Sequence, residues 1–272
     1  MNGKQQYENI PIPDTLDSVI DNAIRCARPR VSPLWRVLAA AACFVLVLFG
    51  VANTPLYTYA ADIPVIGGVV QVLRIGTGGE VTDGAELTAE SEGGSVDLEF
   101  AGMSSAPYFS VERFSAPDRA VITMHGVRFA DRSAVIESVE ATEGVAGAYF
   151  SMILDDSMVQ LVVELEPGFD CTITELSEPA ALRIDFTGGG SVSEEPVWYL
   201  RSETMDLGEG LALLCEQYAQ FDAQQVRTGS GRYAVVIGNY ASEEEALAAL
   251  AELPEDSGFY AESALPNERP AD

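Results

Sequence analysis

The spacing of apolar residues changes along the chain, and each change marks a segment with a different predicted structure. Residues 37–52 form an unbroken apolar run. With its flanks, the segment 34–57 would measure about 36 Å as a helix at ~1.5 Å per residue. The hydrocarbon core of a bilayer is about 30 Å thick. The pattern therefore predicts a transmembrane helix at residues 34–57.

Basic residues indicate the orientation of this helix. Four arginines between residues 25 and 36 precede the apolar run, and the first basic residue after it is Arg74. Because positive charge is retained in the cytoplasm, we expect a single-pass protein of the cell membrane with residues 1–33 as a cytoplasmic tail and the C-terminal domains extracytoplasmic. A cleaved signal peptide is the alternative, but the region before the apolar run is long for one.

The tail itself contains a short amphipathic pattern. Asp14 is a suitable N-cap for a helix that places four apolar residues on one face. These residues are Leu16, Val19, Ile20 and Ile24. Since a helix this short needs a partner to bury its apolar face, it either lies on the bilayer or docks a cytoplasmic protein.

Alternating strand-like patterns dominate the region after the apolar run. Residues 58–105 are rich in Gly, Glu, Ser and Thr, which favours a juxtamembrane segment and linker with one strand at Ser95–Phe100. Residues 106–187 carry short runs rich in Val and Ile, separated by turn signals, and predict an all-β, sandwich-like domain. The predicted strands are Arg119–Met124, Ala134–Glu140, Ala148–Ile153, Val159–Leu165 and Leu182–Phe186.

A different order follows a predicted linker at residues 188–196. Residues 197–266 alternate strand and helix patterns as βαββαβ, which predicts a ferredoxin-like α+β domain with four antiparallel strands and both helices on one face. The second helix is well marked, because Ser242 and Glu245 have the spacing of a capping box. Residues 267–272 form a tail.

Composition and charge exclude several functions. The formal net charge is −27, and an acidic surface repels nucleic acid. The chain has one histidine and no Cys/His spacing typical of a zinc site. We therefore expect no catalytic residue, no metal and no cofactor, and the protein is not expected to be an enzyme. Cys171 and Cys215 fall in separate predicted domains, which disfavours a disulfide between them.

Two motifs suggest families. Ile10–Leu16, the predicted span and residues 62–72 together resemble membrane-anchored bacterial anti-sigma factors, which would imply a sigma factor as cytoplasmic partner. The strand at Ala116–Ile122 and the predicted strands at Val159–Leu165 and Leu182–Phe186 resemble AMIN domains. That resemblance implies targeting to peptidoglycan or to a secretion pore.

A third motif lies in the predicted α+β domain. The segment Tyr233–Ala246 resembles the signature of SPOR domains. The resemblance implies binding to peptidoglycan glycan strands that lack stem peptides. Alternation within the strand turns Tyr233, Val235 and Ile237 toward the helices.

The same alternation gives candidate glycan-contacting residues on the other side of the sheet. Ala234 and Val236 would face the glycan, and Trp198 and Gln225 are weaker candidates. The predicted function is a membrane-anchored cell-envelope protein that binds peptidoglycan or an envelope protein through its C-terminal domains. The alternatives are an anti-sigma-factor-like regulator, whose tail holds a sigma factor while the outer domains sense the wall, and a structural assembly protein.

Overall fold

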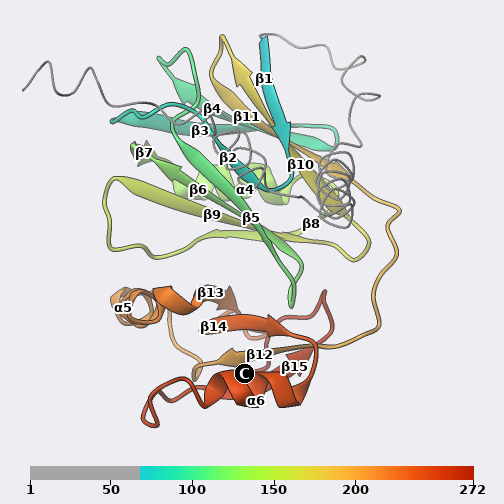
Figure 1. Ribbon diagram of the computed structural model, residues 1–272. Coiled ribbons are helices and arrows are strands. Elements are labelled where there is room, and N and C mark those ends of the chain that lie inside the picture. The colour runs from blue at the N-terminus through green and yellow to red at the C-terminus, as the bar shows by residue number, and fades with distance from the viewer. Residues whose placement is uncertain (1–67) are drawn as a thin grey trace, which may run out of the picture. The chain divides into compact units, whose positions relative to one another are not determined.

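The computed structural model describes residues 68–272 (Figure 1). The predicted tail helix with Leu16 and the predicted span at residues 34–57 lie outside this part. Within it, no helix is long and apolar enough to cross a membrane. The longest helices among residues 68–272 have nine residues, whereas a span needs about 20. The predicted single-pass fold class and the membrane localisation are therefore corrected: the described chain is mostly β structure with three α-helices.

One sheet of the β domain, which we define as residues 68–187, has six strands. In spatial order they are β1 (Gly68–Leu73), β10 (Asp170–Ser177), β11 (Ala181–Thr187), β4 (Ser95–Ala101), β3 (Ala85–Glu92) and β7 (Val127–Ala130). Neighbouring strands are antiparallel except for the parallel pair β3 and β7. Alternation is clearest in β4, where Val96, Leu98 and Phe100 are buried.

The second sheet of the β domain has five antiparallel strands. In spatial order they are β2 (Gly76–Gly78), β5 (Phe109–Phe114), β6 (Arg119–His125), β9 (Met158–Leu165) and β8 (Val145–Phe150). A single hydrophobic core contains inward residues of both sheets, such as Leu98 and Ile122. Helix α4 (Arg132–Glu140) adds Val135 and Val139 to this core. The two sheets therefore form a sandwich with one helix.

Two segments differ from the sequence-based expectation. Residues 68–101, expected to be a linker with one strand, contain four strands. In β3 only small or polar residues accompany Leu87, so its alternation is weak in the sequence although Ala85 and Leu87 are buried. The predicted strand Ala134–Glu140 is helix α4. Its β-branched residues favoured a strand, but Val135 and Val139 have helical spacing, and Asp131 accepts a hydrogen bond as N-cap.

The C-terminal module, defined here as residues 197–264, has the element order expected from the sequence. It runs β12 (Val197–Arg201), α5 (Glu209–Gln217), the short 3-10 helix η1 (Ala219–Phe221), β13 (Gln224–Arg227), β14 (Tyr233–Tyr240), α6 (Glu243–Leu250) and β15 (Tyr260–Ala264). The four strands are antiparallel in the order β13-β14-β12-β15. Ser242 caps α6 by accepting from the Glu245 amide, and the Glu245 carboxylate accepts from the Ala241 amide.

The two described cysteines are free thiols. Cys171 lies in the core of the β domain, and Cys215 packs against the core of the C-terminal module. The two hydrophobic cores are thus separate, and each forms without a cross-link.

Candidate functional site

One face of the module's sheet is buried by the module's own helices. Leu200, Val235 and Ile237 point from the strands into a cluster that includes Leu211 of α5 and Ala246 of α6. Helix α6 runs along this side of the sheet (Figure 1). We call this surface the helix face. It is an ordinary hydrophobic core that the module's own helices close.

The opposite surface, which we call the open face, carries Ala234 and Val236 as alternation predicted. Ala234 is fully buried and Val236 is 5% exposed. Val236 packs with Tyr199 and Val226 of the module and with Ala116 of the β domain. The open face is therefore covered in this structure.

The other two predicted residues lie elsewhere. Trp198 is half-buried and packs against the cluster of the helix face. Gln225 is buried at the edge strand β13, where its side-chain amide bonds both the Met152 nitrogen, at 2.9 Å, and the Met152 oxygen, at 2.7 Å. No observation tests any of the four as a glycan contact, so that role stays a prediction.

Three polar residues of the open face were not predicted from the sequence, namely Tyr199, Arg201 and Glu262. Tyr199 lies opposite Glu262 in the pairing of β12 with β15, and Arg201 lies two residues further along β12. The Tyr199 hydroxyl donates to the Glu262 carboxylate at 2.7 Å, and Arg201 donates to the same carboxylate at 3.3 Å. Burial and the hydrogen bond to Glu262 raise the pKa of Tyr199. Period-two alternation in residues 197–201 places Tyr199 and Arg201 on one face, and this is the sequence signal that indicates them.

Arg201 is completely buried, yet its guanidinium is well supplied with acceptors. Besides Glu262, it donates to the Ser202 carbonyl at 3.0 Å, to the Thr204 hydroxyl at 2.7 Å and to the Ala271 carbonyl. A buried charge is tolerated only when such partners are present. Arg201 thus organises the polar part of the open face.

Residues 265–272, hereafter the covering segment, contact this face. Within it Pro266 and Pro270 are buried. The Ala271 amide donates to Glu262 at 2.9 Å. The turn after β13 also contributes, because the Gly229 amide donates to the Pro270 carbonyl at 3.1 Å. The segment lies along the face without joining the sheet as a strand.

The β domain holds the covering segment from the other side. Glu164 of β9 is 1% exposed and accepts from Arg269 of the segment at 2.6 Å and from Arg227 of β13 at 2.7 Å. The Ala116 amide, in the turn between β5 and β6, donates to the Pro266 carbonyl at 2.9 Å. Side chains of the β domain and of the module therefore both contact the segment.

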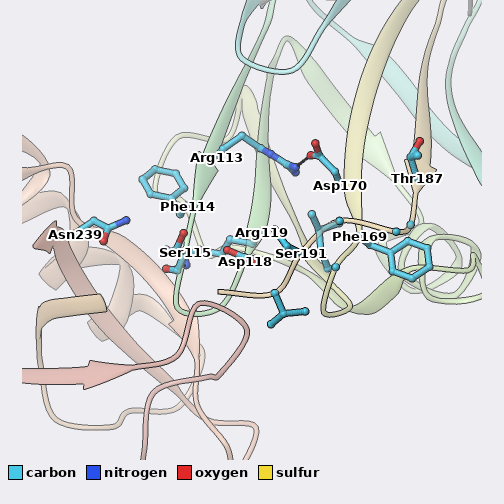
Figure 2. Close-up of a pocket in the computed structure, with 16 residues that line it drawn as sticks. Arg113, Phe114, Ser115, Asp118, Arg119, Phe169, Asp170, Thr187, Ser191 and Asn239 are labelled. Atoms are coloured by element: carbon cyan, nitrogen blue, oxygen red, sulfur yellow. Dashed lines mark hydrogen bonds and ion pairs between the residues drawn. The ribbon is translucent and has the colours of Figure 1, made fainter. Parts of the chain in front are cut away.

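A cavity of about 660 Å³ lies at one end of the β domain (Figure 2). Arg113 extends toward Asp170 and donates to it, while Asn239 lies on the other side of the cavity from Phe169 (Figure 2). Arg119, which also lines the cavity, donates to two backbone carbonyls. Its arginines are thus committed to partners within the β domain, and we place the candidate site on the open face instead.

The chemistry of the open face suits binding better than catalysis. It combines a small apolar surface with a phenol, a guanidinium and a carboxylate that are bonded to one another. In residues 68–272, no group of three or more His, Cys, Asp or Glu side chains is placed to hold a metal ion. A face of this kind can recognise a neutral polar polymer through hydrogen bonds and close apolar contact.

The AMIN-like and anti-sigma-like resemblances gain no support from comparison with known families. Comparison of the chain with curated proteins and with solved structures gives no match. These two resemblances therefore stay predictions of the sequence.

One family does match. Residues 216–265 match the family model described as the SPOR domain. The matched range begins near the end of α5 and includes β13, β14, α6 and β15, while β12 with Tyr199 and Arg201 precedes it. SPOR is a peptidoglycan-binding, non-catalytic domain, so the match supports peptidoglycan binding by a cell-envelope protein.

Proposed function

We propose that this protein binds the glycan strands of peptidoglycan through its C-terminal module and acts in the cell envelope without catalysing a reaction. The SPOR match at residues 216–265 is the observation that carries the proposal. The acidic chain, with a net charge of −27, argues against an anionic polymer as the ligand. Glycan strands freed of stem peptides are the least charged form of the wall polymer and therefore fit best.

We place the glycan on the open face of the sheet. Ala234 and Val236 supply a flat apolar surface on which a sugar ring can lie. Tyr199 and Arg201 of the neighbouring strand β12, with Glu262 of β15, lie beside it and supply donors and acceptors for sugar hydroxyls. Mixed apolar and directional polar contacts of this kind give both affinity and orientation. Trp198, which packs on the helix-face cluster, and Gln225, whose side chain bonds Met152, lie outside this proposed site.

Co-sedimentation tests this proposal. The full chain, mixed with purified peptidoglycan, should appear in the pellet, and treatment of the peptidoglycan with an amidase that removes stem peptides should increase the bound fraction. Tyr199→Phe should weaken binding about three- to tenfold, because loss of one hydrogen bond costs about 1 kcal/mol. Tyr108→Phe, a hydroxyl loss at an exposed position of the β domain, is the matched control. A chain that stays in the supernatant with both polymers would contradict the proposed function.

A further inference from the structure

We propose that the covering segment, residues 265–272, competes with glycan for the open face, so that the structure is a closed state and glycan binds after the segment leaves. The inference rests on the proposed function of that face. It adds a regulated step to binding, because the competing groups belong to the same chain. Its basis is the set of partners that the segment offers to the face.

The segment satisfies the same polar groups that a sugar would need. Its backbone at Ala271 accepts from Arg201 and donates to Glu262, so one peptide residue serves both side chains. Asp272 accepts from the Thr228 hydroxyl at 2.8 Å. Each of these partners is an acceptor or donor that a sugar hydroxyl can replace. The segment therefore stands where a polar ligand would stand.

The segment is also fastened to the β domain, which links the occupancy of the face to the position of that domain. Arg269 bonds Glu164 with two nitrogens, at 2.6 and 3.2 Å. Pro266 accepts from the Ala116 amide, and Ala116 itself packs on Tyr199 and Val236 of the open face. Removal of the segment would therefore also remove contacts that keep the β domain on this face.

The contacts between the covering segment and the open face are of a kind that can break and form again. Arg269 retains 31% of its side-chain exposure, and Glu268, Ala271 and Asp272 are exposed. The apolar residues of the open face form a small cluster, whereas the helix face has a larger one. If the closed state makes up about 90% of the molecules, the apparent affinity for glycan falls about tenfold, since only the open fraction binds.

Removing the ion pair between Arg269 and Glu164 tests the inference. Arg269→Ala in the full chain should raise the affinity for amidase-treated glycan strands several-fold, because the open fraction rises. Arg232→Ala is the matched control: it removes an arginine of the module that pairs with Asp206 at the surface and does not belong to the covering segment. A chain that ends at Leu265 should bind at least as well as Arg269→Ala. Equal affinity of wild type and Arg269→Ala would overturn the inference.

Hydrogen exchange of the wild-type chain provides a second test that needs no variant. Saturating glycan should accelerate exchange of the Ala116 and Ala271 amides. These amides donate the hydrogen bonds that join the covering segment to the β domain and to the open face. The Val235 amide, bonded to Ser202 within the module, should not change. Glycan binding with unchanged protection at Ala116 and Ala271 would overturn the competition and leave the proposed function standing. Absence of glycan binding by wild type and by both opened variants would instead remove the proposed function.

Discussion

The two faces of the module's sheet are both buried, but different parts of the chain bury them. Helices α5 and α6 cover the helix face, and they follow the strands closely in sequence. The β domain and residues 265–272 cover the open face. Ala116 of the β domain packs on it, and Arg201 and Glu262 of the face bond Ala271 of the segment. Glu164 of the β domain bonds Arg227 of the module and Arg269 of the segment. Burial alone therefore does not distinguish a permanent core from a surface that is covered and can be exposed.

Val235 and Val236, which are neighbours in β14, illustrate the difference between the two faces. Val235 and Val236 are 0% and 5% exposed, yet they point to opposite faces. Val235 packs among residues of the module, whereas Val236 packs against Tyr199, Val226 and the turn residue Ala116. If the two faces differ as argued, the same substitution at these two positions should have different consequences.

The largest effect is expected for Val235→Glu. The carboxylate would enter a core that has no partner for it and no route to water except unfolding of the module. We expect a loss of about 4 kcal/mol or more in the free energy of unfolding. Thermal melts followed by circular dichroism measure it. A variant that melts within a few degrees of wild type would show that the helix face is not a closed core.

A smaller effect is expected for Val236→Glu. Here the covering segment and the turn at Ala116 can withdraw and let water reach the carboxylate, so we expect a loss of about 1–3 kcal/mol. The module should stay folded, while hydrogen exchange at residues 265–272 increases. If Val236→Glu lowered the free energy of unfolding as much as Val235→Glu does, the open face would be as closed to water as the helix face.

The smallest expected effect is a slow rate of thiol alkylation at Cys215, which is measured without changing the stability of the protein. Cys215 of α5 packs against the helix-face cluster and donates to the Ala223 carbonyl at 3.1 Å. Burial raises the pKa of the Cys215 thiol to about 11, so at pH 8 roughly one molecule in a thousand carries the reactive thiolate. Alkylation at Cys215, located by peptide mass mapping, should be about 100-fold slower than for a free thiol. It should stay slow in Arg269→Ala, because that variant opens only the other face.

The order of elements in the module was predictable because each helix and strand carries its own local signal. Ser242 and Glu245 form a capping pair within four residues, and alternation in β14 assigns Val235 and Val236 to opposite faces. The same kind of signal was misleading in α4, where β-branched residues favoured a strand. It was too weak in β3, whose inward residues include small alanines.

The candidate site was harder to predict, because its groups come from distant parts of the chain. Glu262 lies opposite Tyr199 only after β15 pairs with β12, and Glu164 meets Arg269 across 105 positions in the sequence. No local pattern encodes such pairs. The sequence could indicate that Ala234 and Val236 share a face, but it could not indicate what lies on that face.

The sequence by itself determined the βαββαβ order, the faces of β14 and the likeness of Tyr233–Ala246 to SPOR domains, since local propensity and periodicity suffice for each. Tertiary structure alone decided that residues 68–101 join the sandwich, that Arg201 and Glu262 form a polar pair, and that residues 265–272 cover the open face. The physical reason is that hydrogen bonds and ion pairs between distant residues depend on how the strands pair. Strand pairing is a property of the assembled sheet and of no single segment.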